Sequence, residues 1–219
     1  MDVCVYVYIQ AYNAEKTIRR AIDSILEQTY SNWKCIVCDN GSLDSTADII
    51  REYAEKDSRI IDIYEENNRR NIIYDRVFPM IFLQANISED LFCWLDSDDE
   101  YYPSFLEQSQ MELDRNSADI VAVGSDFYQE NKRAIVGQRL LKKPYLIEGN
   151  SFDSLFPVYH QFVRTIWGKL YRLNVLAAMD RGKSVNIRYG GDTLFAQEAF
   201  LRSARVYIMN SVHHRYYMS

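Results

Sequence analysis

The stretch Leu91-Phe92-Cys93-Trp94-Leu95-Asp96-Ser97-Asp98-Asp99-Glu100 joins a short apolar segment to a group of acids. Five apolar residues in a row suit a strand that is buried on both faces, as strands are in a parallel sheet. In such sheets, ligands bind outside the carboxyl ends of the strands. The sequence therefore predicts that the acids following this strand lie at a ligand-binding edge.

Carboxylates this close together repel one another unless a cation or hydrogen bonds hold them. Hard oxygen ligands suit Mg²⁺ or Mn²⁺, and Mg²⁺ usually takes one or two carboxylates together with substrate phosphates. One interpretation is that Asp96, Asp98 and Asp99 bind such a metal against a diphosphate. The other is a solvated acidic turn that caps a helix beginning near Ser104. The local sequence supports both equally.

The composition is that of a soluble globular protein. The chain has 219 residues, of which 47% are hydrophobic and 26% charged, which predicts one domain with a full core. A net charge of −6 argues against nucleic-acid binding, which usually requires a basic surface. We expect no signal peptide and no transmembrane helix, because no apolar run approaches the necessary length of about 20 residues.

The cysteines favour a reducing compartment. Cys4, Cys35, Cys38 and Cys93 all lie within apolar, strand-like runs. Cys35 and Cys38 have the spacing of a redox motif, but they lie within a predicted strand rather than at a strand-to-helix turn. We therefore interpret all four as buried small hydrophobic residues and expect a cytoplasmic protein.

The N-terminal part of the chain alternates strand and helix. We expect strands at Val3–Ile9, Trp33–Cys38 and Arg59–Tyr64, a helix at Ala14–Gln28 capped by Asn13, and a second helix capped by Asp44 or Ser45. This order, with short connections, favours an α/β fold with a doubly wound, mostly parallel sheet flanked by helices. Residues 65–87 fit a helix that Pro79 should start, kink or break.

The C-terminal part is less regular. We expect a helix at Ser104–Arg115, a strand at Asp119–Tyr128 with a hairpin partner at Arg133–Gly137, a short extended piece within Lys142–Asn150, a short helix at Ser151–Tyr159, a turn and helix within Trp167–Met179, a strand at Val185–Arg188, a helix at Asp192–Arg202 and a last strand at Arg205–Met209. No Gly precedes Gly41, so the first strand-to-helix turn is neither a dinucleotide fingerprint nor a P-loop.

Four separated motifs occur in order along nearly the whole chain. They are Tyr8-Ile9-Gln10-Ala11-Tyr12-Asn13-Ala14-Glu15 followed by residues 24–30, Val37-Cys38-Asp39-Asn40-Gly41-Ser42-Leu43-Asp44, Leu95-Asp96-Ser97-Asp98-Asp99, and Trp167-Gly168-Lys169-Leu170-Tyr171-Arg172 followed by Gly191-Asp192-Thr193-Leu194-Phe195. Together they resemble the family 2 glycosyltransferases, inverting enzymes of the GT-A fold. The resemblance implies a single domain with a nucleotide-sugar-binding half near residues 1–100 and an acceptor-binding half near residues 101–219, and it favours the metal interpretation of the acidic cluster.

The resemblance also implies roles for individual residues on the donor side. The nucleotide pocket would be formed by Gln10, Ala11, Tyr12, Asn13, Glu15 and Asp39. Asp96 would contact the ribose or a metal-bound water, with Ser97 beside it, and Asp98 or Asp99 would bind Mn²⁺ or Mg²⁺. The family's usual Pro and second Asp are replaced here by Gln10 or Ala11 and by Asn40. Tyr12 as a packed aromatic and Asn13 as a helix cap are compatible with these roles.

On the acceptor side, Asp192 matches the family's catalytic base, and its alternative role is a helix cap. Gly191 stands where the family commonly has Glu. Trp167 and Lys169 would line the donor-sugar or acceptor side, although Trp167 could equally belong to the core. His213 and His214 lie where some GT-A enzymes supply a metal ligand, but we expect them to belong to a solvated tail.

The leading hypothesis is a metal-dependent inverting glycosyltransferase for surface polysaccharide synthesis. It would move a sugar from a nucleotide diphosphate sugar, by expectation UDP-linked, to a saccharide or lipid-linked acceptor, which is compatible with peripheral membrane association. One alternative, suggested by Asn40 and Gly191, is a nucleotide-sugar-binding protein that has lost catalysis. Another is a sugar nucleotidyltransferase, whose Gly-rich loop after the first strand has no counterpart here.

Overall fold

The computed structural model describes residues 3–69, 71–179 and 190–218. The strands in these ranges are β1 (Val5–Ala11), β2 (Trp33–Asp39), β3 (Ile60–Tyr64), β4 (Leu91–Asp96), β5 (Glu100–Tyr101), β6 (Ile120–Gln129), β7 (Ala134–Arg139), β8 (Tyr145–Glu148), β9 (Lys169–Arg172) and β10 (Arg205–Met218). The helices are α1 (Ile18–Leu26), α2 (Thr46–Lys56), α3 (Phe78–Gln84), α4 (Phe105–Arg115), α5 (Ser151–Ser154), α6 (Phe156–Tyr159), α7 (Leu173–Ala177) and α8 (Gly191–Arg202). Three short helical segments complete the description, namely η1 (Ile73–Val77), η2 (Glu130–Lys132) and η3 (His160–Arg164).

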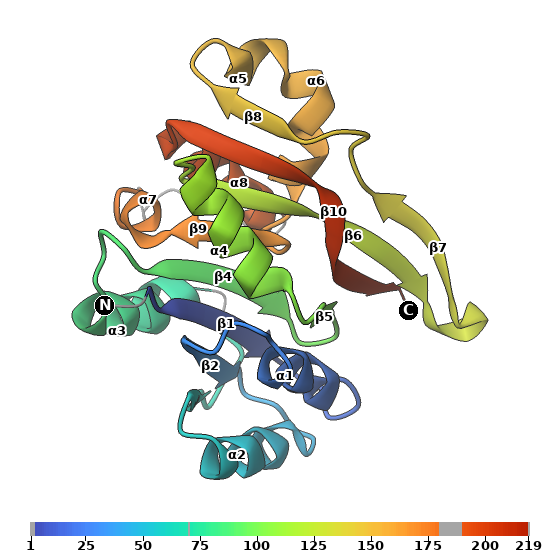
Figure 1. Ribbon diagram of the computed structural model, residues 1–219. Coiled ribbons are helices and arrows are strands. Elements are labelled where there is room, and N and C mark those ends of the chain that lie inside the picture. The colour runs from blue at the N-terminus through green and yellow to red at the C-terminus, as the bar shows by residue number, and fades with distance from the viewer. Residues whose placement is uncertain (1–2, 70, 180–189, 219) are drawn as a thin grey trace.

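All the described strands belong to one sheet of order β3-β2-β1-β4-β9-β6-β10-β5, with β7 paired to β6 and β8 to β10 (Figure 1). The neighbours β3, β2, β1 and β4 are parallel. Beyond β4 the pairing changes, because β9 runs antiparallel to both β4 and β6. The predicted α/β class with a doubly wound sheet is therefore confirmed.

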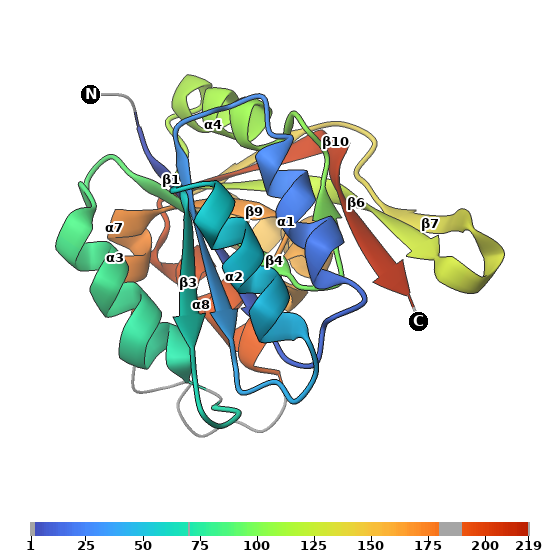
Figure 2. The ribbon, with the colours of Figure 1, turned by 90° about the horizontal axis from the view of Figure 1, so that it is seen from below.

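Helices cover both faces of the parallel part of this sheet, which explains why β1, β2 and β4 are mostly apolar. Val5, Val7 and Ile9 of β1 pack with α1, α2 and α4 on one face, while Tyr6 and Tyr8 pack with α3, α7 and α8 on the other. Figure 2 shows α1 and α2 lying across the parallel strands, whose carboxyl ends point to one edge of the molecule. The residues predicted for the donor site gather at that edge.

The first helix begins later than the sequence predicts. Asn13 has a φ of 51° and its amide oxygen accepts a hydrogen bond from the Leu43 amide, so it does not cap a helix at Ala14. The helix α1 starts at Ile18 instead. Pro79 acts as anticipated, since it occupies the first turn of α3 directly after η1.

Two features of the C-terminal part also differ from expectation. The strand β9 forms where a turn was predicted, because it fits between β4 and β6. The final strand continues to Met218, which places His213 and His214 in buried positions of β10 rather than in a solvated tail. Its pairing with β6 over nearly its whole length supplies the reason. The predicted strand Val185–Arg188 lies outside the described residues.

Candidate functional site

The strand register brings the predicted donor-site residues together. Gln10 of β1 lies opposite Asp96 of β4, and Ala11 lies opposite Asp39 of β2. The Tyr8 hydroxyl donates to the Gln10 side chain at 3.2 Å, which fixes the amide at the end of the strand. Three adjacent parallel strands thus present polar side chains at one carboxyl edge, as ligand sites in such sheets require.

Two loops at this edge are joined by hydrogen bonds. The Asn13 amide donates to the Ser42 hydroxyl at 2.9 Å, and the Ser45 amide donates to the Glu15 carboxylate at 3.2 Å. Asp39 is buried and accepts from the Ser42 amide at 3.3 Å. Tyr12 is 46% exposed at the tip of the first loop. Asn13, Glu15 and Asp39 are therefore joined through one network of loop hydrogen bonds, beside the exposed ring of Tyr12.

Asn40 organises the loop that follows β3. Its side-chain amide donates to the Asn68 side-chain oxygen at 3.0 Å and to the Arg69 carbonyl at 2.9 Å, and its oxygen accepts from the Arg69 amide at 2.9 Å. An aspartate could not make the two donations. Beside it, Gly41 has a φ of 81°, and a Cβ there would lie 2.9 Å from the Asn67 backbone. The departure from the family pattern at Asn40 thus has a structural reason.

Asp96 is the most perturbed carboxyl that faces this edge. Burial, and then the charges of Asp99, Asp192 and Asp98, raise its pKa to about 8. The Trp94 indole donates to its Oδ1 at 3.0 Å, and the Trp94 ring packs edge-on against Tyr8 at 4.6 Å. A carboxyl held by one donor among like charges favours a proton or a cation.

Asp99 is fully buried and belongs to a different network. Its Oδ1 accepts from the Tyr217 amide at 2.9 Å, and its Oδ2 lies 3.3 Å from His214 Nε2. The His214 Nδ1 lies 3.2 Å from the Ser125 hydroxyl. Burial raises the pKa of Asp99 to about 8 and lowers that of His214 well below its usual value. This pair connects the acidic turn to β10.

Trp167 and Lys169 lie beneath the site. The Trp167 ring stacks on His214 at 4.5 Å and on Tyr216 at 5.4 Å, with the Arg139 guanidinium 4.4 Å from its centre. Lys169 is fully buried and donates to the Thr165 carbonyl at 2.6 Å and to the Trp167 carbonyl at 3.1 Å. Direct contact of Lys169 with a phosphate would require it to leave these acceptors.

Asp192 lies in the first turn of α8, exposed to solvent. The helix is capped by Gly190, and within the described part of the chain the Asp192 carboxylate makes no hydrogen bond, so the capping role is not observed. Surrounding protein atoms raise its pKa, while the charge of Lys169 opposes the rise. The charge of Asp192 also contributes to the raised pKa of Asp96.

Arg20 is a site residue that the motifs did not reveal. From α1 its guanidinium donates to the Asp98 carbonyl and, at 3.0 Å, to Glu130 in η2, and it lies 3.3 Å from the centre of the Tyr217 ring. Partners 78 and 110 residues away along the chain leave no local pattern. Arg20 thereby fixes the acidic turn against both the β6–β7 hairpin and β10.

The donor atoms at the acidic turn fit a divalent metal that is shared with a substrate. Among the described residues, no three Asp, Glu, His or Cys side chains are grouped as metal ligands. Asp99 is fully buried, with its Oδ1 accepting from the Tyr217 amide, which leaves Asp96 and the exposed Asp98. Two carboxylates suit Mg²⁺ or Mn²⁺ when phosphate oxygens complete the coordination.

A doubly wound sheet with loops joined at its carboxyl edge, followed by an acid-tipped strand, defines a GT-A-like α/β protein. The sequence model described as "Glycosyl transferase family 2" matches residues 6–176. This chain belongs to that family. It is 28% identical to glycosyltransferase GlyA of Streptococcus pneumoniae over 221 residues, covering 96% of this chain but 30% of that protein.

Other relatives and solved structures agree. The uncharacterized glycosyltransferase EpsJ of Bacillus subtilis is 24% identical over 94% of this chain and 58% of its own length. The crystal structure of Staphylococcus aureus TarS 1-349 in complex with UDP superposes with a TM-score of 0.75 at 19% identity, covering 98% of this chain and 60% of that one. The chain thus spans only part of the proteins it resembles. No described helix is both long and apolar enough to cross a bilayer.

Replacing Asn40 by Asp should loosen the loop at residues 67–69. Two donated hydrogen bonds would be lost and two acceptors left facing a carboxylate, so we expect the free energy of unfolding to fall by about 1–3 kcal/mol. Urea denaturation measures this. Asn68→Asp is the matched control, because it keeps the oxygen that Asn40 uses and should change stability by less than about 0.5 kcal/mol. Equal effects of the two substitutions would contradict this role.

Replacing Arg20 by Ala should release the acidic turn. We expect faster hydrogen exchange at residues 97–100 and a loss of about 1–3 kcal/mol in stability, because hydrogen bonds from a charged donor and a cation–π contact disappear. Exchange mass spectrometry and denaturation report the two effects. Arg19→Ala is the control, since Arg19 pairs with Glu52 on the surface and should cost under about 1 kcal/mol. Unchanged exchange at residues 97–100 in Arg20→Ala would exclude the anchoring role.

Proposed function

We propose that this chain carries the donor-binding and catalytic residues of a metal-dependent inverting glycosyltransferase. The observation that carries the proposal is the strand register, which places Gln10 beside Asp96 at the carboxyl edge of the sheet. The second acid is Asp192 in the first turn of α8, and its charge contributes to the raised pKa of Asp96. One would serve the acceptor and the other the donor. We place the protein in the cytoplasm because all four cysteines are free thiols.

The donor would be a nucleotide diphosphate sugar, with UDP as the expected nucleotide. The connected loops after β1 and β2 would hold the nucleoside, since Asp39 can accept from a base N–H and Tyr12 offers an exposed ring. Solved structures of TarS contain UDP and UDP-GlcNAc, the latter superposing with a TM-score of 0.76 at 19% identity over 98% of this chain and 58% of that one. The ligands of these TarS complexes support a nucleotide-sugar donor for this chain.

Asp96 and Asp98 would hold Mn²⁺ or Mg²⁺ beside the diphosphate. When bound, the metal would supply positive charge that stabilises the departing phosphates. The high pKa of Asp96 supports this assignment, because a cation would relieve the repulsion among its neighbours. Arg20 would keep Asp98 in place through its bond to the Asp98 carbonyl.

In the chemical step, Asp192 would accept the proton of an acceptor hydroxyl. As that O–H bond breaks, the oxygen forms a bond to the anomeric carbon, and the bond from this carbon to the diphosphate oxygen breaks with its electron pair. One base and one displacement give inversion at the anomeric carbon. The pKa of Asp192 is raised by its surroundings, which makes it a stronger base than a fully solvated aspartate.

The acceptor would be a saccharide or a lipid-linked sugar of surface polysaccharide synthesis. One relative is the UDP-Glc:alpha-D-GlcNAc-diphosphoundecaprenol beta-1,3-glucosyltransferase WfgD of Escherichia coli. It is 46% identical over 59 residues, which covers 27% of this chain and 22% of that protein. This name supports a lipid-linked acceptor, and such an acceptor is compatible with a protein that associates with the inner face of a membrane.

Asp192→Asn should reduce sugar transfer or slow donor hydrolysis by about 10²- to 10⁴-fold, because the amide cannot accept the acceptor's proton. Affinity for UDP with Mn²⁺, measured by calorimetry, should stay within about twofold of the wild type. Glu198→Gln, an acid-to-amide change elsewhere on α8, is the matched control and should retain activity. Full turnover in Asp192→Asn would remove this residue from the mechanism, whereas UDP binding without donor hydrolysis in the wild type would favour a binding protein.

Binding of Mn²⁺ in the presence of UDP should strengthen as the pH rises toward about 8. Because the pKa of Asp96 is about 8 in the metal-free protein, protons compete with the metal below that pH. One displaced proton corresponds to about tenfold in affinity per pH unit. Calorimetry at pH 6, 7 and 8 measures the slope. Asp96→Asn should bind more weakly with a flatter pH dependence, and an equal slope in both proteins would contradict the assignment.

A further inference from the structure

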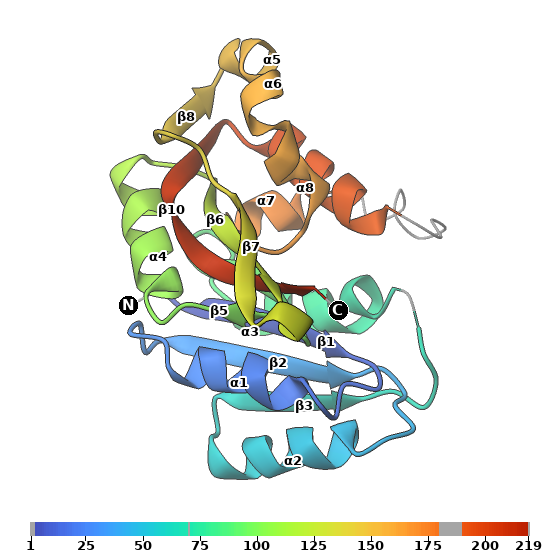
Figure 3. The same cartoon turned by 90° about the vertical axis from the view of Figure 1, so that its right-hand side faces the viewer.

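A second pocket lies away from the strand ends, between α5, α6, η3 and α8. Its volume is about 560 Å³, which is within the range of small-molecule sites. Figure 3 shows α5 and α6 at the end of the molecule opposite α2, with α8 beside them. Most of its lining is apolar and consists of Phe152, Phe156, Tyr159, Val163, Phe200 and Leu201, while Asp153, Gln197 and Ser203 form the polar part.

The walls of this pocket offer few hydrogen bonds. The Tyr159 hydroxyl donates to the Phe152 carbonyl at 2.7 Å, and the Ser203 hydroxyl donates to the Ala199 carbonyl at 2.8 Å. The Tyr159 ring stacks on Phe200 at 5.9 Å. Because most of the lining is apolar and the Tyr159 and Ser203 hydroxyls are already bonded within the protein, the pocket suits an apolar chain better than a sugar, most of whose hydroxyls would lose water without replacement.

Two segments that line the pocket, η3 and α8, also meet at the first turn of α8. The Thr193 hydroxyl donates to the Arg164 carbonyl at 3.0 Å, which joins the start of α8 to the end of η3. Val163, the neighbour of Arg164, already lines the pocket. On α8, Leu194 and Leu201 are seven residues apart and therefore lie on one side of the helix, 38% and 84% exposed. The nine residues from Asp192 to Leu201 span about 14 Å of helix.

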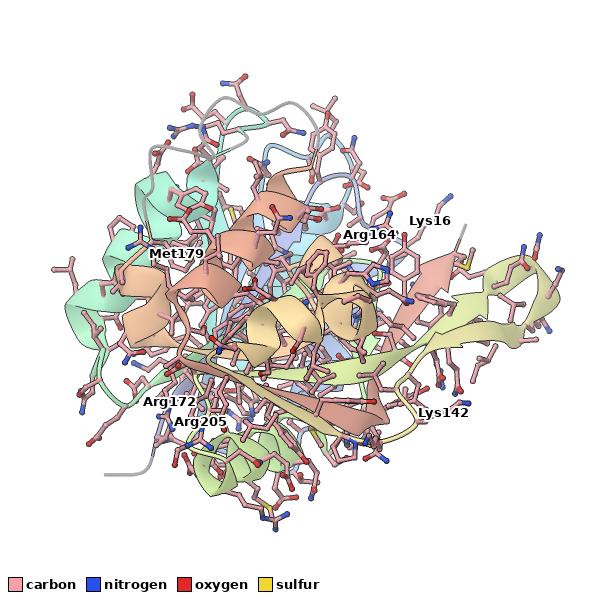
Figure 4. All side chains as sticks on the ribbon, turned by 90° about the horizontal axis from the view of Figure 1, so that it is seen from above. Lys16, Lys142, Arg164, Arg172, Met179 and Arg205 are labelled. Carbon is pink, nitrogen blue, oxygen red and sulfur yellow. The ribbon has the colours of Figure 1, made fainter. Side chains whose placement is uncertain are left out.

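A cation lies at the junction between the pocket and the proposed base. Arg164 is exposed, and within the described ranges its guanidinium has no hydrogen-bond or ion-pair partner. Figure 4 labels it on the side of the molecule where Lys16, next to the first donor loop, is also found. Arginine binds phosphate oxygens in a bidentate manner. Arg164 therefore lies between Val163, which lines the pocket, and Thr193, which follows Asp192 in the chain and bonds to the Arg164 carbonyl.

We infer that this pocket binds the apolar chain of a lipid diphosphate acceptor. The phosphates of the acceptor contact Arg164, and its terminal sugar hydroxyl faces Asp192. The inference rests on the proposed function for the identity of the transferred group, but the lipid site stands on the pocket, the exposed leucines of α8 and Arg164. It names the acceptor as a lipid diphosphate rather than a free saccharide.

The direct test is binding of farnesyl diphosphate, measured by calorimetry below its aggregation concentration. We expect the wild type to bind it and the double variant Phe156→Ser, Leu201→Gln to bind it about tenfold more weakly. Phe156 is 47% exposed, so both changes lie at the surface and the fold should remain intact by circular dichroism. Leu83→Gln on α3 is the matched control, because Leu83 is 87% exposed and does not line the pocket.

Arg164→Ala should weaken binding of both farnesyl diphosphate and inorganic diphosphate, whereas the pocket variant should leave inorganic diphosphate binding unchanged. Absence of farnesyl diphosphate binding to the wild type, or equal binding by wild type and pocket variant, would overturn the inference. Two results with Leu201→Gln would also overturn the inference, if the affinity for farnesyl diphosphate were unchanged. Loss of binding to phosphatidylglycerol vesicles would identify a membrane-docking surface. Dissociation of a dimer would identify an interface between two copies of the chain.

Failure of the proposed function gives a different result. It would appear as a wild type that neither binds UDP with Mn²⁺ nor hydrolyses a donor, and farnesyl diphosphate binding would still decide the pocket. Where transfer occurs, the pocket variant should raise the KM for a prenyl diphosphate sugar about tenfold and leave kcat with a lipid-free sugar acceptor unchanged. A wild type with the same KM for both acceptors would overturn the inference.

Discussion

The constraint on which the site depends is the repulsion among carboxylates at the end of β4. Asp96, Asp98 and Asp99 follow a strand buried on both faces, so the backbone cannot move them apart without disturbing the sheet. The surrounding protein gives each acid a different environment. Asp96 receives the Trp94 indole, Asp99 receives the Tyr217 amide and faces His214, and Asp98 is left exposed with its carbonyl held by Arg20. Only Asp96 and Asp98 retain oxygens that a ligand could reach.

Positive charge is buried directly behind this negative edge. Lys169 and Arg139 have no carboxylate within ion-pair distance among the described residues and donate instead to neutral oxygens of Thr165, Trp167 and Ser125. Burial lowers the pKa of Lys169 well below its usual value and that of Arg139 to about 10. Such burial is unfavourable unless an opposing field offsets it, and Asp192 supplies part of that field at Lys169. The acids and the cations are therefore mutually dependent parts of one electrostatic arrangement.

The sequence predicted the parallel half of the fold better than the other half, and the reason is the range of the contacts. β1, β2, β3 and β4 are recognisable from their own apolar runs, and parallel order then places Gln10 beside Asp96. The strand β9 and the extension of β10 to Met218 exist because β6 offers them a partner, which a local pattern cannot reveal. The same limit applies at the site. The acids were visible as motifs, but Arg20 and Asn40 act through residues at least 28 positions away.

The parallel strands and the helical segments α6, η3 and α8 also differ in how their geometry is determined. The donor edge is built from strand ends and short loops whose geometry follows from the parallel register, so its chemistry is fixed by the fold itself. The proposed acceptor side is formed by α6, η3 and α8, which pack by side chains such as Tyr159 and Phe200 and meet at the Thr193–Arg164 contact. Changes in these helical segments would alter the pocket without disturbing the acids of β4. Under the proposed function, such changes would alter the choice of acceptor and leave the donor chemistry of the strand ends unchanged.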